Sequence, residues 1–571
     1  MRLSFVFAGA LVAIFATFGC NGSSYGPNGS PPKKSGPGAT TPGTQTPKPS
    51  PSPSPSPSPS PSPSPSPAAG AGFTKSADLQ APRGLHTSTL LNDGRVLVVG
   101  GIDAQTAGQA FVVESEIFDP TANTFTKTSD PSLGGNPGGY MAIPDPQGQG
   151  FPVPRGFHTA TLLTDGTVLI CGGYGMETFD ASGNPVQSEM TTAFLFDPKT
   201  NSFGQTPGSL AQARRSHYSV LLPNGQVLVA GGFNSTLNNG QGGTLDTGEI
   251  YDPTQGTFAA APQPMTVPRQ ESGAVATPNG PLIVGGTAVV VQAPATTPNP
   301  FLAPGSDLFD PTQQAFGPGP QPANDRTQCT LDITSKGFVL AGGIGTGGMV
   351  TAVELLDLNL QGFTSIATLA GGRANHASAA TDKGVLLVGG VNVTSTSGAF
   401  TTLDTGEFVD VTANTTATTK MAQTRNSCRA TTLQNGTVLV TGGYTNGKTD
   451  PYGLDGTSVP TAEIFANGST PSPSPSPAPS PAPSPPPSTN LSYATDIVPI
   501  LNAGSCASCH DGNQQPQLQP YSAIMAFVTA GDPNSLLVVK TQAGGSMNKH
   551  LANRSADAAT IKNWVVQGAN P

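Results

Sequence analysis

A unit of twenty residues, Pro82 to Gly101, constrains the fold of this chain most strongly, because it occurs seven times. Each copy holds an arginine, a glycine 11 residues later, and a diglycine whose first member follows the arginine by 16 or 17 residues. Such regular spacing is the signature of a repeat architecture. The arginines are Arg83, Arg155, Arg214, Arg269, Arg326, Arg373 and Arg425, and the turn glycines are Gly94, Gly166, Gly225, Gly280, Gly337, Gly384 and Gly436.

Each repeat predicts four antiparallel strands. Two apolar segments flank a turn, and the second, Val96 to Val99 in the first copy, is apolar throughout and therefore expected to be buried on both faces. The Asn-Gly and Asp-Gly dipeptides between them supply the positive φ of two-residue hairpin turns. A third strand ends in an aspartate, as at Phe118–Asp119, and a phenylalanine six residues later, Phe125, opens the fourth.

Four antiparallel strands in repeats of 47 to 72 residues are typical of a propeller blade. The seventh repeat stops at its third strand, Ala462 to Phe465, and its missing fourth strand is found at Gly72 to Lys75, which resembles Thr124 to Lys127. The N-terminal strand is thus expected to pair with the last repeat. The sequence predicts a mainly β fold, a seven-bladed propeller over residues 72–469.

The pattern resembles kelch repeats, and among them the bacterial propellers similar to the central domain of galactose oxidase. The residues that carry the resemblance are Arg83-x-x-His86, Gly94, Gly100–Gly101 and Glu116-x-x-Asp119, with their copies. Phenylalanine stands where many kelch repeats have tryptophan. The resemblance implies a kelch-type propeller over about 400 residues.

Four of the six histidines fall at one position of the repeat, three residues after the arginine. One interpretation is a structural histidine that caps the inner strand. The other is a ring of His and Cys ligands for copper or zinc at one mouth of the central channel. The histidines are His86, His158, His217 and His376, and the other repeats have Ser272, Cys329 and Cys428 there.

The copper site of galactose oxidase and its relatives, a cross-linked tyrosine and cysteine with a second tyrosine and two histidines, has no matching set here. His217–Tyr218 is the only adjacent pair, and the repeat already accounts for its histidine. Quinoprotein dehydrogenases also join a propeller to a cytochrome, but they depend on repeated tryptophans. The one tryptophan here, Trp564, lies outside the repeats.

The N-terminus predicts export. Arg2 precedes an apolar run, Leu3 to Phe18, which is too short for a stable membrane span and is typical of a signal peptide over residues 1–20. Thr17 to Cys20 resembles the lipobox of bacterial lipoproteins, which implies lipidation of Cys20 and attachment to a membrane. The alternative is an ordinary exported chain with a free Cys20.

Two proline-rich segments mark boundaries. Residues 21–71 are predicted to form a disordered stalk, in which Ser50 to Pro67 alternates Ser and Pro and would extend roughly 55 Å as polyproline II. A linker follows the repeats at 470–490. The formal net charge is −9 and no basic patch is found, which argues against nucleic acid as a partner.

The C-terminal segment, residues 491–571, contains Cys506-Ala-Ser-Cys509-His510, the attachment motif for c-type haem. The two thiols would bind the haem covalently, and His510 would ligate its iron. A CxxC redox pair is the alternative. The segment resembles small all-α cytochrome c domains, which implies Met547 as the second axial ligand of the iron. His550, three residues later, is the rival ligand.

These features together predict an exported, lipid-anchored bacterial electron-transfer protein with one haem c, facing the periplasm or the cell surface. The propeller is expected to be a recognition platform that binds a protein or polysaccharide through loops at 130–152, 233–247 and 287–305, and the haem to exchange electrons with a redox partner protein. One alternative makes the propeller a sugar or alcohol oxidase or dehydrogenase, with copper possible, whose electrons reach the haem. Another is an adhesion protein with a sensory haem.

Overall fold

The computed structural model of the chain describes residues 71–105, 110–128, 139–145, 150–290, 299–393, 399–447, 450 and 452–467, together with 497, 560–562 and 565. The chain divides into two compact units, Met1–Pro471 and Ser472–Pro571. Among the described residues, no helix has the length and apolarity that a membrane crossing requires. Several predicted sites lie outside the described residues: Cys20, Cys506, Cys509, His510, Met547 and His550.

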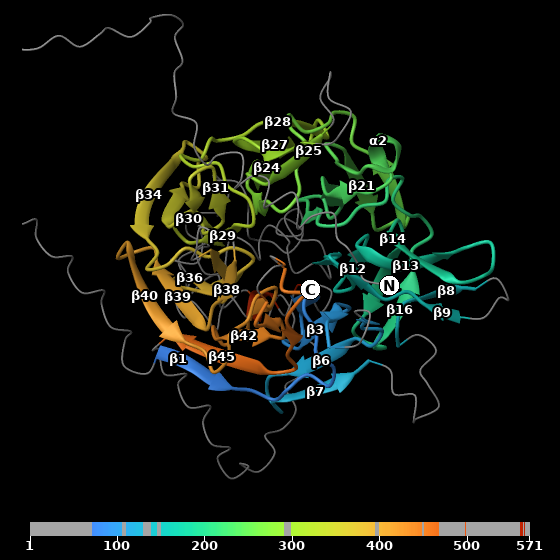
Figure 1. Ribbon diagram of the computed structural model, residues 1–571, viewed down its shortest axis with the longest axis horizontal. Coiled ribbons are helices and arrows are strands. Elements are labelled where there is room, and N and C mark those ends of the chain that lie inside the picture. The colour runs from blue at the N-terminus through green and yellow to red at the C-terminus, as the bar shows by residue number, and fades with distance from the viewer. Residues whose placement is uncertain are drawn as a thin grey trace, which may run out of the picture. The chain divides into compact units, whose positions relative to one another are not determined.

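Seven four-stranded antiparallel sheets are arranged around a common centre in the first unit (Figure 1). Six of these sheets take four strands of one repeat in chain order, and the seventh has the order β1-β45-β42-β41. The mainly β fold predicted from the sequence is confirmed, and the arrangement agrees with a propeller.

The strands of these sheets, from the centre outward, are β2 (Thr87–Leu90), β3 (Val96–Val99), β6 (Glu116–Asp119) and β7 (Thr124–Lys127); β11 (Thr159–Leu162), β12 (Val168–Cys171), β15 (Ala193–Asp197) and β16 (Ser202–Gln205); β17 (Tyr218–Leu221), β18 (Val227–Ala230), β21 (Gly248–Asp252) and β22 (Thr257–Ala260); β23 (Gly273–Thr277), β24 (Gly280–Val284), β27 (Ser306–Asp310) and β28 (Ala315–Pro318); β29 (Thr330–Thr334), β30 (Gly337–Ala341), β33 (Ala352–Leu356) and β34 (Phe363–Thr368); β35 (Ala377–Ala380), β36 (Gly384–Val388), β39 (Thr405–Asp410) and β40 (Thr415–Lys420); and β41 (Arg429–Thr432), β42 (Val438–Thr441), β45 (Ala462–Asn467) and β1 (Ala71–Lys75).

The two ends of the described repeat region meet in one sheet, as the sequence predicted. Strand β1 pairs with β45, and Phe73 lies opposite Phe465 with 5.2 Å between the ring centroids. The same cross-strand pair recurs within other repeats, at 4.8 Å for Phe118 and Phe125 and at 4.9 Å for Phe196 and Phe203. Aromatic pairs of this kind stabilise adjacent strands. Phe73 therefore takes the place of the fourth-strand phenylalanine of the seventh repeat.

The apolar second strands form the centre of each sheet and are buried throughout, as predicted. Three of them, β24, β30 and β36, begin at the turn glycine. The hydrophobic core lies between neighbouring sheets, where for example Leu97 of the first repeat packs with Val168 and Phe196 of the second.

Two residues connect the inner strands in the fourth and fifth repeats, but the hairpin turn of the first repeat is longer than the two-residue form expected from its dipeptide. In the first repeat Leu90 pairs with Val96, so five residues connect the strands, and positive φ occurs at Gly94, at 90°. The Gly94 N–H donates to the Leu91 carbonyl at 3.0 Å. This geometry suits a longer loop in which one glycine adopts the left-handed conformation and relieves the strain of re-entering the strand.

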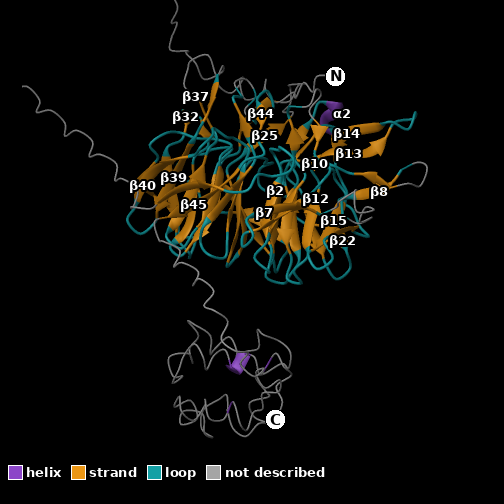
Figure 2. Cartoon of the chain, turned by 90° about the horizontal axis from the view of Figure 1, so that it is seen from below, coloured by secondary structure: helices purple, strands orange, loops and turns teal. Residues whose placement is uncertain are grey.

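A small hairpin follows each diglycine where the sequence indicated only a loop, and several of these hairpins lie on one face of the sheets (Figure 2). Because they are two to six residues long, their alternation is too short to be recognised. They are β4 (Ile102–Asp103) with β5 (Ala110–Phe111), β13 (Tyr174–Phe179) with β14 (Pro185–Glu189) and the short β10 (Arg155–Gly156), β19 (Phe233–Asn234) with β20 (Gly243–Thr244), β25 (Thr287–Val290) with β26 (Asn299–Leu302), β31 (Ile344–Gly345) with β32 (Gly348–Met349), β37 (Val391–Val393) with β38 (Phe400–Thr402), and β43 (Tyr444–Thr445) with β44 (Thr457–Ser458).

The loops expected to bind a partner contain part of this structure. The segment 233–247 includes the four-residue helix α2 (Leu237–Gly240) between β19 and β20. The pair β8 (Ala142–Pro144) and β9 (Gly150–Pro152) falls within 130–152. In the second unit, residues 560–562 are helical, and Ile497, Ile561 and Val565 are fully buried.

Candidate functional site

The anchor arginines explain the spacing of the repeat. In all seven repeats the arginine Nη1 donates to the carbonyl of the first glycine of the diglycine, as Arg83 does to Gly100 at 2.9 Å. In six repeats the guanidinium also forms a buried ion pair with an acidic side chain of the third strand of its sheet, as Arg83 does with Glu116 at 2.6 Å. Removal of either partner would leave a buried charge uncompensated.

The second repeat lacks this acid, because Phe194 occupies the position. The Arg155 guanidinium lies 5.2 Å from the Phe194 ring centroid and donates to the Thr192 hydroxyl at 2.8 Å. Glu177, on the neighbouring hairpin, accepts from that hydroxyl. Burial with only a distant carboxylate lowers the pKa of Arg155 to about 10.

The repeats are joined at the diglycine. The second glycine donates its N–H to the carbonyl of the next repeat's arginine, as Gly101 does to Arg155 at 2.8 Å, and Gly443 of the last repeat donates to Arg83 at 2.8 Å. A Cβ on Gly100 would lie 2.3 Å from the Arg155 carbonyl oxygen. Only glycine allows this approach, which accounts for the diglycine of every copy.

The residue two positions after each arginine has positive φ, between 49° and 57°, although none of the seven is glycine. Their amides form a chain of hydrogen bonds around the centre: Ser427 accepts from Leu85 at 3.1 Å, and Leu85 accepts from Phe157 at 3.3 Å. These bonds offset the cost of the left-handed conformation. The seven residues, here called the central ring, are Leu85, Phe157, Ser216, Glu271, Gln328, Asn375 and Ser427.

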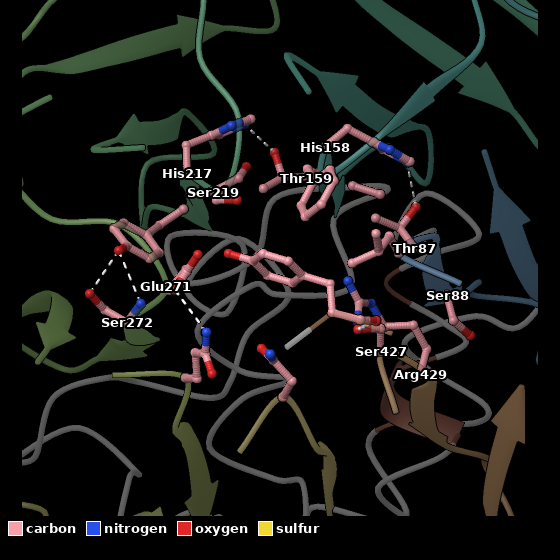
Figure 3. Close-up of a pocket in the computed structure, with 18 of the residues that line it drawn as sticks. Thr87, Ser88, His158, Thr159, His217, Ser219, Glu271, Ser272, Ser427 and Arg429 are labelled. Carbon is pink, nitrogen blue, oxygen red and sulfur yellow. Dashed lines mark hydrogen bonds between the residues drawn. The ribbon is translucent and has the colours of Figure 1, made fainter. Parts of the chain in front are cut away.

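All seven residues of the central ring line one pocket of about 430 Å³, a volume suited to a small ligand. Its wall combines polar and apolar surface in nearly equal shares and includes Ser272, Thr87 and Ser88, and Figure 3 shows Glu271 and Arg429 on opposite sides of it. This site was not predicted from the sequence. The sequence did contain a signal for it: the residue types two and four positions after the arginine differ from repeat to repeat, and these positions line the pocket.

Two groups of the central ring have unfilled hydrogen-bonding capacity. Gln328 donates to Glu271 at 3.2 Å, but the Oε1 atoms of both residues have no partner among the described residues. Burial raises the pKa of Glu271 to about 7, against the opposing effects of the Gln328 bond and the Arg215 charge. Glu271 can therefore be neutral or charged near neutral pH.

The four repeat histidines form hydrogen bonds between neighbouring repeats. Nε2 of His158 is hydrogen-bonded to the hydroxyl of Thr87 at 3.0 Å, and Nε2 of His217 to that of Thr159 at 2.9 Å, in each case one repeat earlier. Burial, with nearby arginines, lowers the pKa of His217 and of His376 to about 3. These contacts support the structural interpretation of the histidines.

The residues present do not fit a copper or zinc ring. No group of three or more His, Cys, Asp or Glu side chains that could hold a metal ion occurs in the part of the chain that the structure describes. His158, His217 and His376 line the pocket with Ser272 and Cys329, but each of these histidines uses Nε2 to bond a threonine.

The described cysteines, Cys171, Cys329 and Cys428, are free and buried. Cys329 and Cys428 lie in different repeats, and no disulfide joins them. Burial raises the pKa of Cys171 to about 11, so this thiol is protonated and unreactive at neutral pH.

Comparison with known proteins agrees with this repeat geometry. The Kelch motif model matches residues 214–265. Two galactose oxidases of Gibberella zeae, one of them from strain PH-1, are 26% and 27% identical to this chain, and each match covers 49% of this chain and 46% of the oxidase. The chain thus spans about half the length of the curated relatives that it matches.

The solved structure of YjhT aligns with 68% of this chain and 96% of its own, at 13% identity and a TM-score of 0.39, too low to add to the assignment. The segment that matches the Kelch motif contains Arg214, its diglycine and its buried acid Glu249. This chain contains a kelch-repeat, β-propeller-like domain.

Proposed function

We propose that this protein is an exported binding module, in which a seven-bladed kelch propeller takes a small polar ligand in its axial pocket, coupled to a monohaem cytochrome c domain that transfers electrons. The observation that carries the binding role is the pocket itself. One residue from each of seven repeats reaches it from the same position, and Glu271 and Gln328 offer acceptor oxygens that no described residue bonds.

The pocket favours binding over purely structural packing because buried polar groups are normally satisfied within the protein. Here two acceptors on the wall have no partner in the part of the chain that the structure describes, and they are left for a molecule that enters. The seven sheets and the Gly443–Arg83 bond support a closed ring of seven blades, which holds these groups in fixed positions. The outer loops remain a second surface for a protein or polysaccharide.

The haem role rests on the sequence. Cys506 and Cys509 would hold one haem c covalently, and His510 with Met547 would ligate its iron, which supplies one-electron transfer when bound. Cys20 would carry the lipid that attaches the exported chain to a membrane at the periplasm or cell surface. A redox partner protein would deliver or accept the electrons.

The binding role is tested by filling the pocket. Ser216→Phe places in the third repeat the residue that Phe157 already provides in the second, at the same positive φ. Calorimetry with millimolar sorbitol and gluconate is expected to show binding to the full chain and loss of binding in Ser216→Phe. Ser182→Phe, on an exposed turn, is the control and should bind as the parent does. Retained binding in Ser216→Phe would contradict the pocket assignment.

The haem role is tested separately by a covalent haem stain on the denatured chain. We expect a stained band that is lost when Cys506 and Cys509 are both replaced by alanine. A stain that survives the double substitution would exclude the haem assignment without affecting the pocket.

An oxidase remains the second candidate, because the curated relatives are galactose oxidases. Metal analysis of residues 72–469, followed by a test for sugar-dependent haem reduction in the full chain, separates the two. Stoichiometric copper, or haem reduction by a sugar, would favour the oxidase.

A further inference from the structure

Arg429 occupies a repeat position that is a hydrogen-bonding threonine in three other repeats. The residue four positions after the anchor arginine is Thr87, Thr159 and Thr330 in three repeats, and each of these threonines is hydrogen-bonded to the histidine of the next repeat. The seventh repeat has Arg429 at this position, on strand β41.

The Arg429 side chain is not needed for the threonine–histidine bond between repeats, because another residue forms the equivalent bond. His86, the histidine that follows, is hydrogen-bonded through Nε2 to the Thr441 hydroxyl at 2.9 Å. Thr441 lies directly opposite Arg429 in the β41–β42 pair. Arg429 is thereby released from the structural role of its position.

Arg429 also lacks the counter-ion that most buried arginines of this protein have. Six of the anchor arginines pair with a buried acid, whereas the hydrogen bond described for Arg429 runs from Nη1 to the Cys428 carbonyl at 3.0 Å. No ion pair of Arg429 with an acid occurs among the described residues. A guanidinium partly withdrawn from water without a counter-ion is a binding site for an oxyanion, and its planar fork matches a carboxylate.

The opposite wall has a different chemistry. Glu271 and Gln328 present acceptor oxygens that have no partner among the described residues, and serine and threonine hydroxyls line the space between. Acceptors of this kind suit the hydroxyl groups of a ligand. The pocket thus combines one site for negative charge with a wall that recognises neutral hydroxyls (Figure 3).

We propose that the axial pocket binds a small polyhydroxylated carboxylate, with Arg429 holding the carboxylate and Glu271 and Gln328 accepting hydrogen bonds from its hydroxyls. This assignment rests on the proposed binding function and names its ligand class.

The test compares two probes that differ in one terminal group, gluconate and sorbitol, by titration calorimetry on the full chain at pH 6. Gluconate is expected to bind about tenfold or more tightly than sorbitol, the effect of one charge-assisted pair. The variant Arg429→Thr restores the residue of three other repeats and should fold. It is expected to bind gluconate no better than sorbitol, with an unchanged or higher melting temperature.

Arg95→Thr is the matched control, since it removes a positive charge from a partly exposed arginine paired with Asp93 and should leave both affinities unchanged. Equal binding of gluconate and sorbitol to the parent, or gluconate affinity retained in Arg429→Thr, would overturn the carboxylate assignment and leave the pocket as a polar binding site. Displacement of gluconate by equimolar inorganic phosphate would also overturn it. Binding of neither probe would overturn both proposals.

Discussion

At the scale of single residues, buried ionisable groups with opposite pH responses surround the pocket. The repeat histidines are held neutral, because burial lowers their pKa. Glu271 is shifted in the other direction, with its pKa raised to about 7 by burial. The unfolded chain restores ordinary pKa values to all of these groups, so the stability of the fold should depend on pH from both sides.

The histidines predict a loss of stability on acidification. A group whose pKa is depressed in the folded state contributes stability above its unfolded pKa, near 6.5, and loses it as pH falls. His376, with a pKa of about 3, should contribute a slope of about 1.4 kcal/mol per pH unit below pH 6.5. Chemical denaturation at pH 7.5 and pH 5 measures it. His376→Ser, which copies Ser272, should show a shallower loss; an unchanged slope would contradict the assignment.

Glu271 predicts the opposite effect. Because its pKa is raised from the ordinary value to about 7, the folded state retains a proton that the unfolded chain has lost, and stability falls as pH rises from about 4.5 to about 7. Arg215, Tyr218 and Gln328 are the groups that face it. Glu271→Gln should remove this loss and raise the free energy of unfolding by about 3 kcal/mol at pH 8 relative to the parent. A variant no more stable than the parent at pH 8 would show that Glu271 is ionised without cost.

At the scale of the element, the anchor arginine of each repeat binds the segments that precede and follow the second strand of its sheet. The Arg83 guanidinium bonds the Gly100 and Glu114 carbonyls and the Glu116 carboxylate. That carboxylate also accepts the backbone N–H groups of Gln80 and Ala81. One buried pair therefore fixes three segments of the repeat, which the sequence showed only as an invariant spacing.

The cost of breaking this pair is predicted from its burial. Glu116→Gln removes the charge that compensates Arg83 and should lower the free energy of unfolding by about 3–5 kcal/mol. Glu114→Gln, two residues away, removes a partly exposed pair with Lys127 and should cost about 1 kcal/mol or less. Urea titration of both variants measures the difference. Similar losses in the free energy of unfolding for the two variants would mean that the buried ion pair stabilises the fold no more than the exposed one.

At the scale of the whole molecule, the first described strand completes the last sheet. Residues about 390 positions apart are paired in β1 and β45, as Thr74 and Ile464 are. The Gly443–Arg83 bond joins the seventh repeat to the first. The fold thus depends on contacts between the two ends of the repeat region, and its stability should be sensitive to either end.

Because β1 closes the last sheet, Phe73 should contribute more to the free energy of unfolding than its neighbour Thr74 does. Phe73 packs against Phe465 and a cluster that includes Phe408, whereas Thr74 is exposed. Phe73→Ala should lower the free energy of unfolding by about 3 kcal/mol, and Thr74→Ala by less than 1 kcal/mol. Thermal and urea unfolding of both variants provide the comparison. Equal effects would indicate that β1 contributes little to closure.

The sequence by itself determined the repeat, the apolar central strands and the pairing of Phe73 with the last repeat, because each depends on a local pattern copied seven times. It also supplied the haem motif, which stays a prediction. The small hairpins were not predicted because strands of two to six residues are too short to show a clear alternation.

Only the tertiary structure decided the site. Glu271, Gln328 and Arg429 belong to three repeats and are ordinary polar residues in the sequence. Rotation of the repeats about one centre brings their positions into a single pocket. Whether a group is paired or unpaired there depends on distances between residues far apart in the chain, as when Thr441 replaces Arg429 as the partner of His86, and such distances are fixed only by packing.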